Sequence, residues 1–169
     1  MEKKTKEETM KALASQLRKP SGEAATEVGD KMNEVNLQIN LDTIETLGLS
    51  KGDNVLEIGM GNGFFVKNIM SMGESINYTG CDFSKEMIDE SEKMNADYIK
   101  SERVKFHLAN ADNLPFDNNE FNKVFTINTI YFWEDVQKFL SEIKRVLKEN
   151  GQFVLSIRPK SSMDHFPFS

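Results

Sequence analysis

The sequence predicts an α/β fold, a doubly wound and mostly parallel sheet of the Rossmann type, on the basis of three observations. Short apolar runs typical of strands alternate with helical patterns from residue 54 onward. A turn that contains three glycines follows the first of these runs, at the place where such folds bind ligands. The 169 residues suffice for one domain with a sizeable core.

Composition and charge narrow the class of protein. The chain is 38% hydrophobic and 28% charged, a composition typical of globular proteins, and its net charge is −6. Its basic residues are dispersed among acidic ones, so we expect no nucleic-acid-binding face. No apolar run approaches the ~20 residues of a membrane span, and the N-terminus lacks the apolar segment of a signal peptide. We therefore expect a cytoplasmic protein with no membrane partner. We also expect no metal site, because the one cysteine and two histidines are not spaced as metal ligands.

Two helices are predicted before the glycine-rich turn. Residues 6–19 carry apolar side chains at helical spacing, and residues 19–30 have the glycine and proline content of a connection. A second helix is expected from Asp30, a suitable N-cap, to about Gly48.

Strands and helices alternate in the remainder of the chain. The expected strands are residues 54–58, 76–82, 104–109, 121–128 and 152–157, and the expected helices are residues 61–72, 84–94 and 136–150, the last closed by Asn150-Gly151. The connection between the third and fourth strands is too short for a full crossover helix, so we expect a loop or one helical turn there. We expect the strand order 3-2-1-4-5, with ligands bound at the carboxyl ends of the strands.

The glycine-rich turn lies in the stretch VLEIGMGNGFF, residues 55–65. A phosphate-binding P-loop would need Lys and Ser or Thr after its last glycine, but Phe64 follows Gly63. A dinucleotide-binding turn would need its third glycine at position 64. Glu57, two residues before Gly59, would repel a pyrophosphate and attract a cation.

Two further acidic residues are expected at the same edge of the sheet. Asp82 ends the second strand, where a carboxylate accepts hydrogen bonds from ribose hydroxyls, a feature that NAD-binding proteins share. Asp112 follows the third strand and is placed to accept from an adenine amino group. Three acids around one pocket suit an adenosine that carries positive charge, and S-adenosylmethionine is such a ligand.

Four stretches in order resemble the motifs of class I S-adenosylmethionine-dependent methyltransferases, of the methyltransferase-11-like or ubiquinone/menaquinone-biosynthesis type. They are VLEIGMGNG, CDFSKEM, ADNLPFDNNEFNKVF and RVLKENGQFVLSI, within residues 50–157. The resemblance implies S-adenosyl-L-methionine as cofactor. It implies that Glu57 acts on the cofactor's amino group, that Asp82 binds the ribose and that Asn128 lies beneath the methionine portion. It further implies that Gly59, Gly61 and Gly63 admit the methionine portion, that Phe83 and Met87 flank the adenine, and that Ala111, Asp112 and Asn113 hold the adenine edge.

The segment NTIYFW occupies the place where some nitrogen methyltransferases carry Asn-Pro-Pro-Tyr. Asn128 and Tyr131 match the ends of that motif, but Thr129 and Ile130 replace its prolines, so this substrate class is not favoured. The aromatic residues 131–133 fit an apolar lip over the methyl group and equally fit packing at a helix start. Tyr131 is the one candidate catalytic residue, by position alone.

The function that the sequence favours is methyl transfer to a small-molecule acceptor by in-line displacement. Two alternatives remain at this point. One is a non-catalytic domain that binds or senses S-adenosylmethionine. The other is an NAD-dependent oxidoreductase, which Glu57 and Phe64 disfavour.

The two ends of the chain lead to further hypotheses. Residues 1–48 are expected to form helices that close as a lid over the cofactor, with Arg18 or Lys19 meeting its carboxylate, and residues 49–169 the cofactor-binding domain. The family implies a helix and an antiparallel strand pair after residue 157, for which the last twelve residues are too few. The chain is then either a shortened form, with acceptor-binding residues missing, or a naturally minimal sheet. In both cases we expect an open edge at the fifth strand and a possible homodimer through it.

Overall fold

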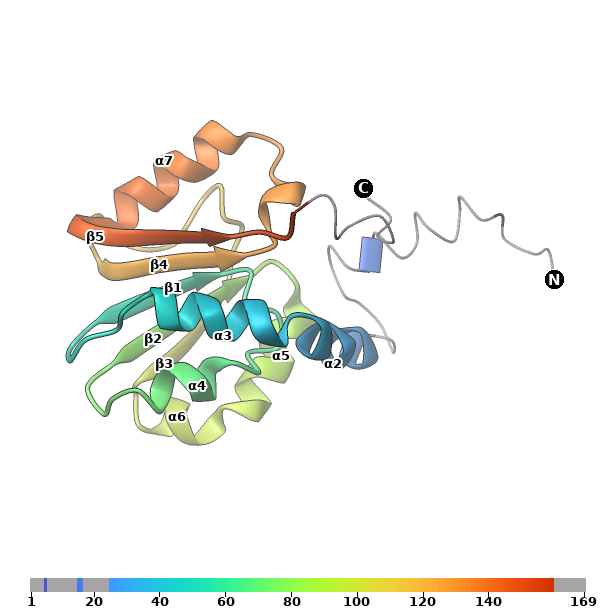
Figure 1. Cartoon of the computed structure of the whole chain (residues 1–169), viewed down its shortest axis with the longest axis horizontal. Helices are drawn as coiled ribbons and strands as arrows, with labels where there is room; N and C mark the ends of the chain where they lie inside the picture. The colour runs from blue at the N-terminus through green and yellow to red at the C-terminus, as the bar shows by residue number, and fades with distance from the viewer. Residues whose placement is uncertain (1–4, 6–14, 17–24, 160–169) are drawn as a thin grey trace.

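The computed structural model describes residues 5, 15–16 and 25–159, and its centre is a five-stranded parallel sheet in the order β3-β2-β1-β4-β5 (Figure 1). The strands are β1 (Asn54–Ile58), β2 (Asn77–Asp82), β3 (Val104–Leu108), β4 (Phe121–Ile127) and β5 (Leu147–Ser156). All four neighbouring pairs are parallel. The predicted fold class and strand order are confirmed.

Helices cover both faces of the sheet. They are α2 (Ala25–Val35), α3 (Leu37–Thr46), α4 (Val66–Met70), α5 (Lys85–Met94), α6 (Ala96–Lys100) and α7 (Val136–Val146), with a short 3₁₀ helix η2 (Ile130–Phe132). In Figure 1, α3 crosses the front of the sheet, α7 lies above β5, and α2 continues past the strand ends. Helix α2 therefore lies over the carboxyl edge of the sheet.

The core is divided by the sheet because side chains alternate between the faces of a strand. Val55 of β1 packs with Ile44 of α3 and Ile69 of α4. Leu56, the next residue of β1, packs on the other face with Ile143 of α7. This alternation also puts Glu57 on the α3 and α4 face, one residue before the end of β1.

The second helix begins earlier than the sequence predicts. Residues 25–30, expected as part of a connection, form the first half of α2, and the chain then bends at Asn36 between α2 and α3. Gly29 is not a helix breaker but a contact residue, because a Cβ there would lie 3.1 Å from the Asn62 amide nitrogen. The predicted helix at residues 6–19, with Arg18 and Lys19, lies outside the described residues except for positions 15 and 16.

Two further boundaries differ from the prediction. Helix α4 spans only Val66–Met70 of the expected residues 61–72. Helix α7 ends at Val146, and Asn150-Gly151 lies inside β5 instead of closing the helix. Asn150 has a φ of +62°, a conformation that asparagine tolerates. The Asn-Gly pair thus marks the irregular start of β5, where the register with β4 shifts.

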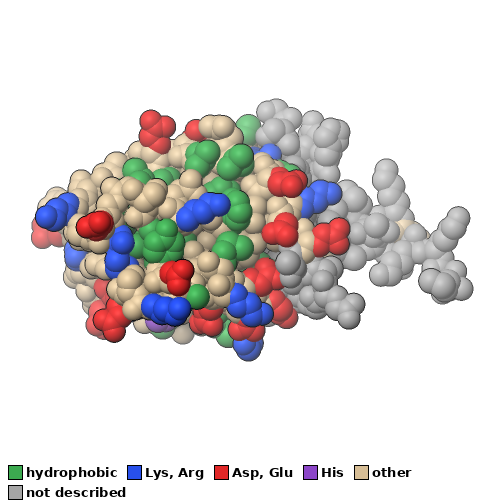
Figure 2. Space-filling model, turned by 90° about the horizontal axis from the view of Figure 1, so that it is seen from below, with side chains coloured by type: hydrophobic (Ala, Val, Ile, Leu, Met, Phe, Trp, Pro, Cys, Tyr) green, Lys and Arg blue, Asp and Glu red, His purple; other side chains and the backbone are tan. Residues whose placement is uncertain are grey.

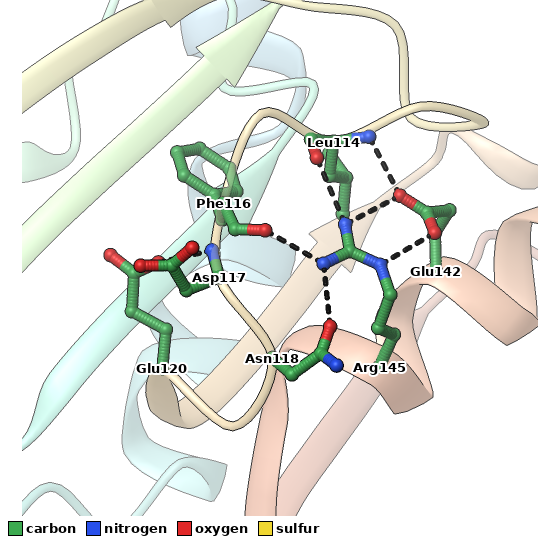
Figure 3. A network of polar contacts seen from close by, with 7 residues as sticks. All are labelled: Leu114, Phe116, Asp117, Asn118, Glu120, Glu142 and Arg145. Atoms are coloured by element: carbon green, nitrogen blue, oxygen red, sulfur yellow. Dashed lines mark hydrogen bonds and ion pairs between the residues drawn. The ribbon is translucent and has the colours of Figure 1, made fainter.

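The connection between β3 and β4 is a loop without a helix, as predicted, and α7 holds it in place (Figure 3). The Arg145 guanidinium binds both carboxylate oxygens of Glu142, at 2.8 and 2.7 Å. It also donates to the carbonyl oxygens of Phe116 (2.7 Å) and Leu114 (2.9 Å) and to the Asn118 side chain (3.1 Å). This network fixes the path of the loop that leads from the end of β3.

The surface and the sheet edges bear on the partners predicted from sequence. On the face shown in Figure 2, basic and acidic side chains are interspersed, and Lys and Arg do not gather into one patch. Within the described residues, no helix is both long and apolar enough to cross a membrane. Strand β5 lies at an edge of the described sheet, and pairing of two copies through it stays a prediction.

Candidate functional site

A cavity of about 200 Å³ lies at the carboxyl ends of β1, β2 and β4. Helix α2 and the start of α3 form its roof, the Gly59–Gly63 turn forms its floor, and residues after β2, β3 and β4 form its walls. Its polar and charged lining consists of Asn33, Asn36, Asn40, Glu57, Asn62, Cys81, Asp82, Asn110, Asn128 and Thr129. Met32, Met60, Phe65, Phe83, Met87, Phe132, Trp133 and Phe139 are its larger apolar residues.

Backbone N–H groups of the glycine-rich turn bind the end of β2. Gly59 and Met60 both donate to the carbonyl oxygen of Cys81, at 2.8 and 3.3 Å. Gly61 donates to the carboxylate of Asp82 at 3.0 Å. These three N–H groups therefore bind β2 and do not point at a ligand. In a turn that binds a diphosphate, the N–H groups would point at the phosphates.

The three glycines of the turn have positive φ angles but different surroundings. At Gly61 a Cβ would meet nothing within 4 Å, so its backbone borders open space in the cavity. At Gly59 a Cβ would lie 2.5 Å from Thr129. Gly63 is outside the cavity lining, because it packs on α5, where a Cβ would lie 2.9 Å from that of Ser91.

Glu57 is a buried acid of the site, with 6% of its surface exposed. The Tyr78 hydroxyl donates to its carboxylate at 2.6 Å. Burial raises the pKa of Glu57 to about 7, with the Tyr78 hydrogen bond opposing and the nearby Asp82 carboxylate adding to the shift. A cationic group beside Glu57 would stabilise its charged form.

Asp82 is held in a fixed orientation at the end of β2. One carboxylate oxygen accepts from Gly61 N–H, and the other accepts from Ser84 N–H at 2.9 Å. The Ser84 side chain in turn caps α5 by accepting from the Met87 N–H. Phe83 and Met87 line the same wall of the cavity, so the CDFSKEM stretch presents an acid, an aromatic ring and a thioether together.

The third predicted acid lies elsewhere. Asp112 is outside the cavity lining and forms an ion pair with Lys138 of α7 at 3.0 Å. Asn113 is exposed and also outside the lining, whereas Ala111 borders the cavity. The structure thus brings together two of the three acids, Glu57 and Asp82.

Asn128 and Tyr131 are both joined to Arg158, which follows β5. The Asn128 side chain lines the cavity, donates to the Asn36 side-chain oxygen at 3.1 Å and accepts from the Arg158 N–H at 3.1 Å. The Tyr131 hydroxyl donates to the Arg158 carbonyl oxygen at 3.0 Å and accepts from its N–H at 2.8 Å. Tyr131 lies outside the cavity lining, and these contacts give its hydroxyl a structural role.

Sequence reasoning missed the residues of the roof. Asn33, Asn36 and Asn40 all border the cavity from α2 and α3. Their spacing of three and four residues is the sequence signal that could have found them, although Asn33 lies in α2, Asn40 in α3 and Asn36 at the bend between the two helices. Phe139 of α7 was also not predicted as a site residue, although it borders the cavity and stacks on Trp133 with ring centroids 4.8 Å apart.

The charge of the cavity fits an S-adenosylmethionine-like ligand. Among the described lining residues the titratable groups are Glu57, Asp82 and Cys81, and none is Lys or Arg. Burial raises the pKa of the Cys81 thiol far above its usual value, so it stays protonated. No cluster of three potential metal-binding side chains occurs in the part of the chain that the structure describes. Two carboxyl groups beside an open glycine backbone match a ligand that carries ammonium and sulfonium groups.

This combination of a parallel sheet in the order 3-2-1-4-5 with an acidic cavity at its carboxyl edge defines the class of protein. The chain belongs to the methyltransferase-11 family, whose methyltransferase domain matches residues 56–155. Members of this family use S-adenosylmethionine.

Two curated relatives are 27% and 32% identical to this chain over the aligned residues. The uncharacterised methyltransferase YdaC of Bacillus subtilis is 27% identical over 75% of this chain and 68% of its own length. The ubiquinone/menaquinone biosynthesis C-methyltransferase UbiE of Rickettsia prowazekii is 32% identical over 60% of this chain and 42% of its own. The chain therefore spans less than half the length of UbiE.

Solved structures share the fold. A Haloferax volcanii protein assigned as a methyltransferase, in complex with the Trm112 methyltransferase activator, has a TM-score of 0.73 at 22% identity and covers 84% of this chain and 62% of its own. Geranyl diphosphate C-methyltransferase of Streptomyces coelicolor, bound to Mg²⁺, geranyl diphosphate and S-adenosyl-L-homocysteine, has a TM-score of 0.66 at 17% identity. That comparison covers 83% of this chain and 53% of the other.

Proposed function

We propose that this protein transfers the methyl group of S-adenosylmethionine to a small-molecule acceptor. The observation that carries the proposal is the cavity in which Glu57 and Asp82 meet at the open backbone of Gly61. Family membership supports the same reaction.

The residues of this chain would divide the cofactor between them. Ionised Glu57 binds the ammonium group, and Tyr78 keeps its carboxylate in place through the 2.6 Å hydrogen bond. Asp82, already oriented by two backbone N–H groups, accepts from the ribose hydroxyls. Phe83 and Met87 supply an apolar wall for the adenine ring.

The acceptor would enter on the side of β4. Ile127, Phe132 and Trp133 line the cavity there, and Trp133 is supported by its stacking on Phe139. This aromatic wall suits the apolar body of an organic molecule and excludes water from the line of attack. When bound, the cofactor supplies an electrophilic methyl group, whose carbon–sulfur bond breaks as the acceptor's lone pair attacks, leaving S-adenosylhomocysteine.

The test is a turnover assay. Purified protein is incubated with methyl-labelled S-adenosylmethionine and a panel of phenols, thiols, amines and carboxylic acids, and S-adenosylhomocysteine and labelled products are quantified. We expect acceptor-dependent turnover, and we expect Glu57→Gln to abolish it. The control is Asp89→Asn, which removes an exposed ion-pair partner of Lys85 and should leave turnover unchanged. Tight binding of S-adenosylmethionine without turnover on any acceptor would favour the sensing domain. Binding of NAD alone would contradict the proposal.

A further inference from the structure

A tyrosine of β2 contacts the buried carboxylate of β1 from behind the cavity. The register of the sheet puts Glu57 opposite Gly80 of β2, and Tyr78 precedes Gly80 by two residues, so its side chain lies on the same face. The Tyr78 hydroxyl donates to Oε2 of Glu57 at 2.6 Å. Tyr78 is 1% exposed and is not part of the cavity lining. It can therefore affect a ligand in the cavity only through another side chain.

Gly80 leaves the space for this contact. A Cβ at Gly80 would lie 3.0 Å from the Tyr78 hydroxyl oxygen and 3.1 Å from the Phe106 ring of β3, and it would collide with the Met60 sulfur. Gly80 is not among the glycines with a positive φ angle, so space and not backbone conformation accounts for a glycine here. The Phe106 ring also packs edge-on against Tyr78, with ring centroids 6.2 Å apart, and helps to hold the tyrosine in place.

The two carboxylate oxygens of Glu57 have different surroundings. Oε2 accepts from Tyr78, whereas Oε1 accepts no hydrogen bond from a described residue. Oε1 is not a fully buried atom, because among the described residues the one fully buried side-chain nitrogen or oxygen without a partner belongs to Asn33. Since Glu57 lines the cavity, Oε1 is the oxygen that a ligand can reach.

We propose that Tyr78 is a positioning residue for the cofactor: its hydroxyl holds Glu57 with Oε1 toward the cofactor's ammonium group, and Gly80 provides the space in which it does so. The inference rests on the proposed function, in which Glu57 binds that group. A carboxylate that is already oriented loses less conformational freedom when the ligand binds. The hydrogen bond also favours the charged form of Glu57, which an ammonium group requires.

The groups around Glu57 oppose its ionisation, except for Tyr78. Burial raises the pKa of Glu57 to about 7, the Tyr78 hydrogen bond opposes this rise, and the Asp82 carboxylate adds to it. Burial also raises the pKa of Tyr78 and of Cys81, so both keep their protons at neutral pH and Tyr78 stays a donor. The charged side chains of α3, α4 and β4 are exposed or hydrogen-bonded elsewhere: Asp42, Glu45, Lys67 and Lys123. Without the Tyr78 hydroxyl, less Glu57 is therefore ionised at pH 7.

The experiment is isothermal titration calorimetry of Tyr78→Phe with two nucleosides between pH 6 and pH 8.5. S-adenosylhomocysteine carries the amino-acid portion, and 5′-methylthioadenosine lacks it. We expect S-adenosylhomocysteine to bind Tyr78→Phe about fivefold more weakly than the wild type at pH 7 and within about twofold of it at pH 8.5, where Glu57 is ionised in both proteins. Binding of 5′-methylthioadenosine should be unchanged at every pH.

The matched control is Tyr98→Phe in α6. This change also removes one tyrosine hydroxyl, but Tyr98 lies outside the cavity lining, so we expect wild-type affinity for both nucleosides. A double-mutant cycle then tests whether Tyr78 acts through Glu57, because Tyr78→Phe should cause no further loss of affinity in the Glu57→Gln background. Gly80→Ala displaces the hydroxyl and keeps the ring, and it should show the same pH-dependent loss as Tyr78→Phe.

Three results would overturn the inference. They are wild-type affinity of Tyr78→Phe for S-adenosylhomocysteine at pH 7, an equal loss for both nucleosides, and a loss that persists undiminished in the Glu57→Gln background. In the last two cases Tyr78 would act through packing and not through the carboxylate. If Tyr78→Phe does not fold, Gly80→Ala decides by the same criteria. Failure of the wild-type protein to bind either nucleoside would instead contradict the proposed function and the inference with it.

Discussion

The cavity has a wall and a roof that are held in contrasting ways. The wall is the loop of residues 109–120, which Arg145 of α7 holds through three hydrogen bonds, to the carbonyl oxygens of Phe116 and Leu114 and to the Asn118 side chain. The roof is α2, whose end is held by Arg158 and Asn128. On the roof, the Asn33 amide nitrogen is buried and unpaired. The wall loop is thus fixed to α7 at several points, whereas α2 is fixed by contacts at its end.

This contrast assigns the two regions to different tasks. A loop whose backbone is fixed by hydrogen bonds to α7 keeps its shape and is pre-organised for one face of the ligand. Helix α2 in the roof borders the cavity through Gly29, Met32 and Asn33. Substitutions in the wall should therefore lower stability, and substitutions in the roof should lower affinity.

The largest effect on stability is expected from Arg145→Ala. The change removes the guanidinium partner of the Leu114 and Phe116 carbonyl oxygens and leaves the Glu142 carboxylate with the Leu114 N–H but without a cation. We expect the free energy of unfolding to fall by about 2–3 kcal/mol, measured by urea denaturation. Lys144→Ala, an exposed neighbour on the same helix, is the control and should change it by less than ~0.5 kcal/mol. Equal stability of the two variants would show that the wall does not depend on Arg145.

Glu57→Gln should separate stability from binding. The folded-state pKa of Glu57 is raised from 4.5 to about 7, so between these values the folded protein binds the extra proton. The free energy of unfolding of the wild type should therefore decrease as the pH rises from 4.5 to 7, and this decrease should be absent in Glu57→Gln.

Cofactor binding should show the opposite trend. Because an ammonium group needs the ionised form of Glu57, wild-type affinity for S-adenosylhomocysteine should increase as the pH rises through 7. Glu57→Gln should bind at least tenfold more weakly at pH 8 than the wild type, measured by calorimetry. A variant that binds as tightly as the wild type at pH 8 would remove Glu57 from the site.

A smaller effect is expected from Arg158→Ala in the roof. It removes the donors to the Val35 carbonyl and the Asn36 side chain, so α2 should be held less firmly over the cavity. We expect S-adenosylhomocysteine affinity to fall about fivefold, with a change in the free energy of unfolding below ~1 kcal/mol. A loss of stability as large as that of Arg145→Ala, with affinity unchanged, would contradict the division between wall and roof.

The smallest effect is expected from Lys138→Ala. This exposed side chain pairs with Asp112, and exposed ion pairs contribute little because water and salt screen them. We expect no measurable change in melting temperature or in S-adenosylhomocysteine affinity. A clear loss of affinity would mean that Asp112 acts on the ligand after all.

The sequence was sufficient to predict the sheet because strand alternation and glycine placement are local signals. The strands follow from such patterns, and their order follows from the rules for doubly wound parallel sheets. The missed features depend on partners far away in sequence. Gly29 is tolerated inside α2 because it packs on Asn62, and no pattern within residues 25–35 contains that contact.

The candidate site shows the same limit. Glu57 and Asp82 end adjacent strands, so pairing of β1 with β2 brings them together. Asp112 is carried by a loop, and its direction is set by Lys138, 26 residues further along the chain. The roles of the site residues toward the cofactor stay predictions.

The central claim is that Glu57 and Asp82 together bind a cationic adenosine at the carboxyl edge of the sheet. A crystal structure of the protein with S-adenosylhomocysteine tests it most directly. We predict the ammonium group within hydrogen-bond distance of Glu57 and the ribose hydroxyls on Asp82. A ligand bound outside this cavity, or one whose carboxylate lies on Glu57 and whose ribose is remote from Asp82, would contradict the account.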